Sequence, residues 1–270
     1  MKTKLISLLI LALSSSLVAT TPKSKHQQQC PKLDNRGYNK CKRVANILKR
    51  EYGKHIKVFD CRKNQLILSD NTKICYDDRK RKSFYQLLNS ADIEDMFRFT
   101  YPKGARGFGK APAKNFDPGR IRNEKFFKKM YGNRASEVKK RLVTLNWVKG
   151  KIKVTRVNGV DKDIKEVVKD LKRLLVKHPE YMKYLYPIGG TFSWRKIAGT
   201  KRLSVHSFGA AIDINVKYSA YWRWSKGKYR YQNKIPLDIV KIFEKHGFIW
   251  GGKWYHYDTM HFEYRPELLH

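Results

Sequence analysis

The sequence predicts an α+β protein in which a small antiparallel sheet with flanking helices is preceded by a small disulfide-bonded module. Two amphipathic helices are expected in the C-terminal part of the chain, at residues 161–178 and 236–246. Short segments with the alternating pattern of β-strands accompany them, among them a hairpin at residues 142–155. The four cysteines of the 270-residue chain all fall between positions 30 and 75.

The N-terminal segment is typical of a secretory signal peptide. Two lysines precede an apolar run at residues 5–13, and the small residue Ala19 stands where a signal peptidase would cut. The run is shorter than the roughly 20 residues that a membrane-spanning helix needs. We therefore expect residues 1–19 to be a signal peptide and residues 20–29 a flexible leader. The protein is then exported, to the periplasm or out of the cell, with no transmembrane segment after cleavage.

The cysteine pattern agrees with export. Four cysteines in an exported chain are typical of two disulfides, for which three pairings exist. A four-thiolate zinc site is the alternative, but it needs closer spacing such as C-x-x-C, which is absent from this sequence. We expect residues 30–78 to form the disulfide-bonded module, paired as Cys30–Cys41 and Cys61–Cys75. The second of these pairs brackets an expected hairpin.

Within the module we expect one helix followed by three strands. Lys63-Asn64 and Asn71-Thr72 supply the turns between the strands. The helix is expected at residues 42–52, and the strands at residues 56–61, 65–68 and 73–76.

Residues 79–160 are predicted to be a helical and hairpin extension, to which the sequence assigns no role. Helices are expected at residues 83–98 and 123–131, before the hairpin at 142–155. Between the two helices, residues 102–123 are rich in glycine and proline. Irregular connections of this length in compact proteins are often functional or mobile.

Residues 161–270 are expected to form the C-terminal domain. The apolar residues of the helix at 161–178 recur every three or four positions and so form one apolar face. Asp161 is expected to cap the start of this helix, and Pro179 to end it. The helix at 236–246 begins with a proline and ends before a glycine.

The composition is strongly basic. The formal net charge is +36, from 59 Lys and Arg residues against 23 Asp and Glu residues. Such a surface attracts polyanions through long-range steering and counterion release. For an exported protein, anionic cell-envelope polymers are the expected partners. Nucleic acid is not favoured, because the basic residues are scattered and no nucleic-acid-binding motif accompanies them.

Three potential metal ligands lie in two separated blocks of the sequence. His206 precedes an expected apolar strand at residues 211–216, which is interrupted by Asp213. A carboxylate among apolar strand residues is costly unless it is paired, hydrogen-bonded or bound to a metal. His261 lies on another expected strand, at residues 260–264. Two imidazoles and one carboxylate suit Zn²⁺ and leave a fourth position for water, as in catalytic sites. A purely structural role is the alternative.

Asp258 is the candidate general base. A zinc hydrolase needs a group that takes a proton from the attacking water and passes it to the leaving amine. Asp258 stands three residues before His261, close enough to do this without being a ligand. The alternative is that Asp258 only orients a ligand by hydrogen bonding.

The sequence at these residues resembles the VanX/VanY-type D-alanyl-D-alanine peptidases, and within them the L-alanyl-D-glutamate endopeptidases of phage endolysins. An acid three residues before the last histidine ligand, the second block of the family, is met by Asp258 and His261. The resemblance covers roughly residues 180–267 and leaves the module at 30–78 unexplained. The family pattern S-x-H-x-x-G-x-A-x-D is met in full by Ser204, His206, Gly209, Ala211 and Asp213.

The resemblance implies a hedgehog/DD-peptidase fold, Zn²⁺ on His206, Asp213 and His261, and Asp258 as general base. An aspartate at the base position resembles the endolysin branch, since the VanX/VanY enzymes are expected to use glutamate. Gly251-Gly252-x-Trp254 resembles the same branch.

Further site residues are expected around this core. Family members carry an arginine upstream of the first ligand that stabilises the oxyanion. Arg195 is our first choice, Arg202 the reserve, and a surface ion pair the alternative for Arg195. Ser204, Trp254 and Arg202 are expected to contact substrate, although core packing suits Trp254 equally well. Glu263 is expected to hydrogen-bond a ligand histidine. His256 is read as a surface residue, with proton donation as the alternative.

These features favour an exported zinc metallopeptidase that hydrolyses peptide bonds in the stem peptides or cross-links of bacterial peptidoglycan. Endopeptidase action at L-Ala-D-Glu is slightly favoured over D-Ala-D-Ala carboxypeptidase or D,D-endopeptidase action. A second hypothesis is a non-catalytic zinc-bearing module that binds the cell wall, as in hedgehog signalling domains. A third is an exported polyanion binder, which rests on charge alone.

Overall fold

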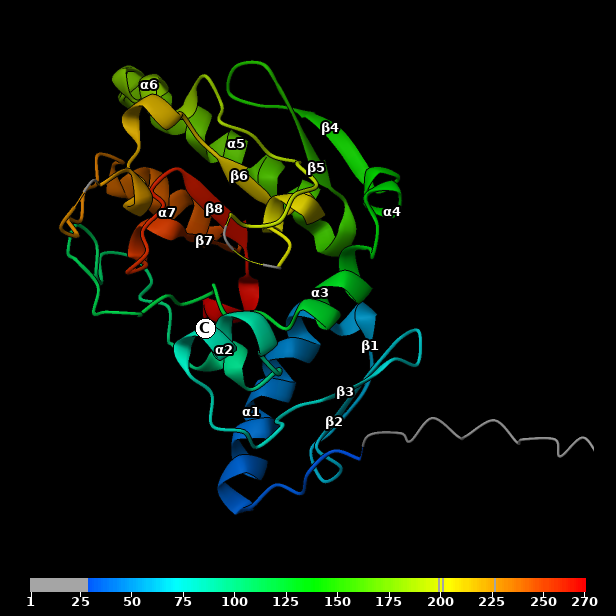
Figure 1. Ribbon diagram of the computed structural model, residues 1–270. Helices are drawn as coiled ribbons and strands as arrows, with labels where there is room; N and C mark the ends of the chain where they lie inside the picture. Colours follow the sequence, from blue (N-terminus) through cyan, green and yellow to red (C-terminus); the bar gives the residue numbers. More distant parts are fainter. Residues whose placement is uncertain (1–28, 199, 201, 226) are drawn as a thin grey trace, which may run out of the picture.

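The computed structural model describes residues 29–270 except 199, 201 and 226. The expected signal peptide and all but the last residue of the expected leader lie outside the described residues. The described chain is a mixture of helices and three small antiparallel sheets (Figure 1). Among these residues no helix combines the length and apolarity needed to cross a bilayer.

The N-terminal part is a long helix packed on a three-stranded sheet. Asp34 caps the helix by accepting a hydrogen bond from Gly37 N, so the helix begins seven residues earlier than predicted. One face of the helix, with Val44 and Leu48, is fully buried. The elements are α1 (Asn35–Tyr52), β1 (Ile56–Asp60), β2 (Gln65–Leu68) and β3 (Lys73–Cys75), and the sheet order is β1-β2-β3.

The predicted disulfide pairing is wrong. The bonds join Cys30 to Cys75 and Cys41 to Cys61, with Cα atoms 5.5 and 5.8 Å apart. Cys41 lies on the buried face of α1, which packs against the end of β1 near Cys61. Cys30 lies beside β3 instead. The prediction relied on nearness in sequence, whereas the packing of the helix on the sheet decides which sulfurs meet.

The middle of the chain departs from the prediction at two helices: the short helix at Ala135–Lys139 was not expected, and one expected helix is cut short. The helix expected at 83–98 ends at Ser90. Beyond it the Asp92 and Asp95 carboxylates accept hydrogen bonds from each other's backbone N–H groups, at 3.0 and 2.9 Å, and Lys82 lies against both carboxylates. Such side-chain bonds replace helical ones. The elements are α2 (Phe84–Ser90), α3 (Glu124–Tyr131), α4 (Ala135–Lys139), β4 (Leu142–Asn146) and β5 (Lys151–Thr155).

The C-terminal part holds a three-stranded sheet beside two helices (Figure 1). Its strand order is β6-β8-β7, all antiparallel, and β7 was not predicted. The expected strand at 211–216 is shorter because Asn215 caps a helical turn. The first helix has Gly159, not Asp161, at its N-cap. The elements are α5 (Val160–Lys177), α6 (Met182–Leu185), β6 (Ala211–Asp213), α7 (Leu237–Lys245), β7 (Phe248–Trp250) and β8 (His261–Tyr264).

One continuous apolar core joins the N-terminal and C-terminal parts. The same cluster of buried side chains contains Leu48 of α1, Phe126 of α3 and Phe262 of β8. Tyr52 meets Phe126 edge-on, with ring centroids 5.6 Å apart. In Figure 1 the C-terminal segment, drawn in red, runs from β8 toward α1. The buried core therefore extends from α1 to the sheet that carries the candidate site.

We predict that the protein contains no free thiol and that the two bonds follow the structural pairing. The export expected from the sequence and the packing of Cys41 against Cys61 both favour this result. Mass spectrometry of a non-reduced proteolytic digest should recover peptides joined through Cys30–Cys75 and Cys41–Cys61. Peptides joined through Cys30–Cys41 would contradict the packing of α1 on the sheet.

Candidate metal centre

His206 is presented by a single turn of 3₁₀-helix, Val205–Phe208. Ser204 caps this turn, because its hydroxyl accepts a hydrogen bond from His206 N at 3.4 Å. The turn ends at Gly209, which has a φ of +66°. A Cβ at Gly209 would also lie 2.5 Å from Leu142 Cδ2 and 3.1 Å from Thr155 N. The glycine therefore allows the chain to turn sharply from His206 into β6 against the neighbouring hairpin.

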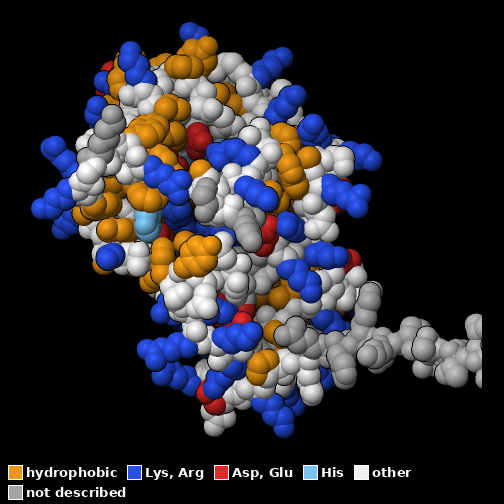
Figure 2. All heavy atoms as spheres, in the orientation of Figure 1, with side chains coloured by type: hydrophobic (Ala, Val, Ile, Leu, Met, Phe, Trp, Pro, Cys, Tyr) orange, Lys and Arg blue, Asp and Glu red, His pale blue; other side chains and the backbone are white. Residues whose placement is uncertain are grey.

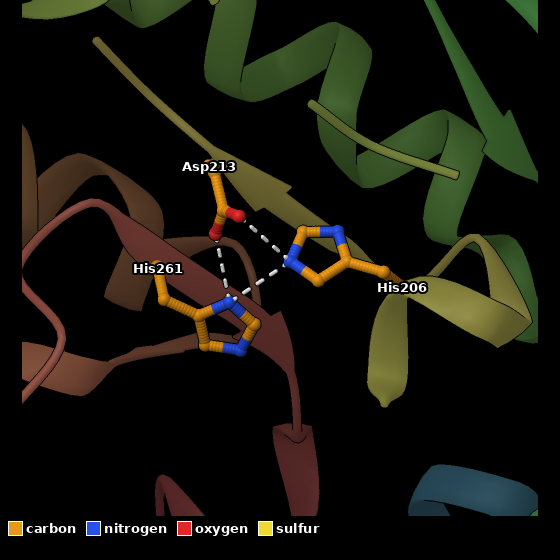
Figure 3. Close-up of side chains that lie close together, drawn as sticks. All are labelled: His206, Asp213 and His261. Carbon is orange, nitrogen blue, oxygen red and sulfur yellow. Dashed lines mark hydrogen bonds and ion pairs between the residues drawn. The ribbon is translucent and has the colours of Figure 1, made fainter. Parts of the chain in front are cut away.

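Asp213 and His261 face each other across the sheet. They are direct partners in the β6–β8 register, so their side chains leave the same face of the sheet. Figure 3 shows these two side chains and His206 converging on one point. His261 Nδ1 lies 2.9 Å from Asp213 Oδ1, and His206 Nε2 lies 3.1 Å from Asp213 Oδ2. The two ring nitrogens are 3.1 Å apart.

The outer nitrogens of both histidines are held by hydrogen-bond acceptors. His206 Nδ1 lies 2.7 Å from Thr191 O, and His261 Nε2 lies 3.0 Å from Glu263 Oε2. Each outer nitrogen therefore carries a proton, which leaves the inner nitrogen of each ring with a lone pair. Two lone pairs and a carboxylate then point at one another. Such an arrangement needs a positive charge between its members.

The spacing suits a tetrahedral metal ion. Bonds of about 2.0 Å to a tetrahedral Zn²⁺ separate neighbouring ligand atoms by about 3.3 Å. The three observed separations, 2.9 to 3.1 Å, approach one face of such a tetrahedron. All three side chains are mostly buried, and their ligand atoms all lie within 4.8 Å of one another. The residues therefore fit the cation that the sequence predicts.

The electrostatics of the centre agree with this fit. Burial opposes a charge on His261, but hydrogen bonds to Asp213 and Glu263 outweigh it and raise its pKa to about 10. Burial alone would raise the pKa of Asp213, yet His206 and His261 hold it well below its ordinary value. The centre therefore favours a positive charge at this point, which a metal ion supplies as well as a proton does.

Two other groups of three acidic residues also bring ligand atoms within 4.8 Å of one another, but a lysine lies among their carboxylates. They are Asp77, Asp78 and Asp92, and Asp92, Glu94 and Asp95. Lys82 Nζ lies 3.0, 2.9 and 2.5 Å from carboxylate oxygens of Asp78, Asp92 and Asp95. Within the described residues, only the centre at His206 combines histidines with a carboxylate.

Asp258 lies beside the centre without joining it. Its backbone accepts a hydrogen bond from His261 N at 3.2 Å, which closes the turn before β8. Its Oδ1 is buried and has no hydrogen-bond partner among the described residues. Burial raises the pKa of Asp258, an effect opposed by the charge of His261 and supported by that of Asp213. A carboxylate so placed has an oxygen free to accept a proton.

The structure separates the two candidate arginines. Arg195 is exposed, and the hydrogen bonds that it makes within the described residues come from its backbone, to Ser204 and Ser207. Arg202 is only 4% exposed, and its Nη1 donates to Arg120 O at 2.6 Å. Its Nε and Nη2 have no partner among the described residues. Burial, then Arg122 and Arg120, lower the pKa of Arg202 to about 9.

Several residues near the centre were not predicted. Arg120 lies over the Trp254 ring at 5.7 Å, and its charge acts on Asp258. The fully buried Asp117 accepts a hydrogen bond from His256 N, and one of its oxygens lies 2.6 Å from His256 Nδ1. Asp117 and Arg120 both belong to the glycine- and proline-rich connection. The length of this connection was the only sequence feature that indicated a function there, and a length identifies no particular residue.

The structure gives Trp254 a packing role. The side chain is 4% exposed, its Nε1 donates to Pro118 O at 2.6 Å, and its ring lies 5.6 Å from that of His261. His256 is not an isolated surface residue, because it is held by Asp117 and stacks on Phe84. The expected contact between Glu263 and a ligand histidine is present, at 3.0 Å from His261.

Comparison with known proteins supports the assignment of a peptidase. Residues 198–264 match a family model described as D-alanyl-D-alanine carboxypeptidase. This range contains all three candidate ligands and Asp258. Neither a curated protein nor a solved structure matches the chain. The match supports the peptidase family in which the sequence resemblance places these residues, and it leaves the branch within that family open.

We predict that His206→Ala largely abolishes zinc binding, because it removes one of three ligand atoms. His178→Ala is the matched control, since His178 is partly exposed at the end of α5 and lies outside the centre. Zinc content per chain, measured by elemental analysis after dialysis, should be near one for the parent and the control. Full retention of zinc by His206→Ala would remove this residue from the ligand set.

Proposed function

We propose that the protein is an exported zinc peptidase that hydrolyses peptide bonds in bacterial peptidoglycan. The proposal rests chiefly on one observation: two ring nitrogens and a carboxylate converge beside an unpartnered aspartate. The family match at residues 198–264 supports peptidase chemistry independently of that geometry. Retention of both the ligand set and Asp258 argues against a non-catalytic binding module.

His206, Asp213 and His261 would hold Zn²⁺. When bound there, the ion would polarise the scissile carbonyl and make water more acidic. Asp258 Oδ1, which has no other partner, accepts the proton of the attacking water and delivers it to the leaving amine. Glu263 and Thr191 keep the two imidazoles in the tautomers that direct their lone pairs inward.

An arginine should stabilise the negative charge that develops on the carbonyl oxygen. Arg195 remains the candidate by resemblance, and its exposed side chain is free to turn toward substrate. Arg202 has two buried N–H groups without an acceptor among the described residues, which is costly in the absence of a ligand. We therefore assign to Arg202 the recognition of an anionic group of the substrate, with Arg120 beside it.

Three cleavage specificities are compatible with the proposal. The aspartate at position 258 favours L-Ala-D-Glu endopeptidase action through its likeness to the endolysin branch. The description of the matching family favours D-Ala-D-Ala carboxypeptidase action, and D,D-endopeptidase action is related to it. Mass spectrometry of the products released from purified peptidoglycan separates these specificities. Only L-Ala-D-Glu endopeptidase action cuts the stem peptide between its first and second residues.

Anionic polymers of the cell envelope are the proposed second partner. Lys and Arg side chains are spread over the face shown in Figure 2, with few carboxylates between them. A cavity of about 990 Å³, lined by residues of the module at 30–78 and of the extension at 79–160, carries five cationic side chains beside the carboxylates of Asp78 and Asp92. We propose that this module and the extension at 79–160 bind the wall and support the catalytic domain at 161–270. The cationic lining consists of Lys32, Arg62, Lys63, Lys73 and Lys125.

We predict that a chelator abolishes hydrolysis of wall peptides and that added Zn²⁺ restores it. The parent protein is incubated with purified peptidoglycan, with and without chelator, and released peptides are quantified. Hydrolysis that continues in chelator, from a preparation shown to contain no zinc, would exclude the proposed chemistry. Binding to the wall without any hydrolysis would favour the non-catalytic module instead.

We predict that Asp258→Asn lowers the rate by about 10²- to 10⁴-fold, the range typical of base catalysis. The substitution keeps size and shape but removes proton acceptance, so zinc content should stay near one. Asp258→Glu should retain part of the activity.

Asp238→Asn is the matched control, because Asp238 is exposed in the first turn of α7. If Asp258→Asn has near-parent activity, another group must be the general base, and His256 would be tested next. An Asn variant that also loses zinc would make Asp258 structural.

A further inference from the structure

We propose that Tyr52, at the end of α1, is a positioning residue for the metal ligand His261. The inference rests on the proposed zinc site. It assigns to the N-terminal module a part in metal binding, which neither the sequence motifs nor the family match at residues 198–264 indicates.

A continuous chain of polar contacts joins the two residues. Tyr52 OH donates to Glu267 Oε2 at 2.5 Å, and Arg265 Nε donates to the other oxygen of Glu267 at 2.5 Å. Arg265 Nη1 lies 3.2 Å from Glu263 Oε1. Glu263 Oε2, in turn, lies 3.0 Å from His261 Nε2. Three side chains thus lead from α1 to the imidazole.

The chain is sealed from solvent along its whole length. Tyr52 and Arg265 are 0% exposed, and Glu263 and Glu267 are 1% exposed. Water therefore cannot replace a lost contact, and a buried carboxylate oxygen without a partner is costly. The position of each member is fixed by the next.

Arg265 is the member through which the effect of Tyr52 is transmitted. Its guanidinium bridges Glu267 and Glu263 and also donates to Gly119 O. When Tyr52 OH is removed, Arg265 is the only hydrogen-bonding partner left to the Glu267 side chain within the described part of the protein. We expect the guanidinium to be drawn toward Glu267 and away from Glu263. Glu263 then orients His261 less firmly.

A purely local support for His261 would not need Tyr52. Arg122 Nη1 also approaches Glu263 Oε2, but their distance of 3.7 Å is longer than a hydrogen bond. The other oxygen of Glu263, Oε1, is contacted by Arg265. Glu263 Oε1 therefore depends on Arg265, and through Arg265 on the contacts to Glu267 and Tyr52 of α1.

The test is Tyr52→Phe, which removes the hydroxyl and keeps the ring on Phe126. Zinc affinity is measured by competition with a chromophoric chelator on the full-length mature protein. Changes in the groups behind a metal ligand typically weaken binding by about 10- to 100-fold. Because Tyr52 acts through three intermediates, we expect a loss of about 3- to 10-fold. The visible spectrum of the Co²⁺-substituted protein should change as well.

Two controls separate positioning from general stability. Tyr76→Phe is the matched control, because Tyr76 is also 0% exposed in the module, but its hydroxyl has no partner among the described residues. Val44→Ala removes buried packing from α1 without cutting a hydrogen bond. Both should keep parent zinc affinity and the parent Co²⁺ spectrum, although Val44→Ala should melt at a lower temperature.

Each outcome decides the matter. A loss of affinity confined to Tyr52→Phe supports the positioning role. Equal affinities for Tyr52→Phe and Tyr76→Phe would overturn it, and so would an equal loss in Val44→Ala. A parent protein that binds no zinc would instead overturn the proposed function, and this inference with it.

Discussion

The convergence of His206 Nε2, His261 Nδ1 and an Asp213 carboxylate within 3.1 Å is the constraint on which the rest of the site depends. Like partial charges at this distance repel, and burial removes the water that would screen them. The surrounding chain must therefore hold the groups in place. Strand pairing fixes Asp213 against His261, and the Ser204-capped turn fixes His206.

The same constraint explains the charged residues behind the sheet. A carboxylate is needed to orient His261, and Glu263 can be buried there only because Arg265 and Arg122 lie beside it. Arg122, together with the hydrogen bond to His261, lowers the pKa of Glu263 to about 2 in spite of burial. Arg265 in turn needs Glu267, which needs Tyr52. Each buried charge requires the next, so the polar network extends until it reaches α1.

The sequence predicted the parts of this arrangement that are local. The spacing of His206 and Asp213, and of Asp258 and His261, follows from short motifs, and regular periodicity predicted α5, α7 and the β4–β5 hairpin. Contacts between segments that are far apart in the sequence correspond to no such motif or periodicity. The disulfide pairing was predicted wrongly for this reason, and Arg120, Asp117 and Tyr52 were missed. The helix prediction at 83–98 was wrong for a different reason. The Asp92 and Asp95 carboxylates accept hydrogen bonds from each other's backbone N–H groups, which ends the helix early.

The buried network also bears on the basic surface. Most buried carboxylates of the described chain have basic partners, as in Glu244 with Lys253 and Glu267 with Arg265, although Asp258 does not. The interior is therefore close to neutral, and the net charge of +36 resides mainly at the surface. A surface charge of that size attracts polyanions over about 10 Å at moderate ionic strength. In the proposed function, attraction of this kind concentrates substrate without selecting a bond. We assign the selection to Asp258 and Arg202, which have buried polar atoms without a partner among the described residues.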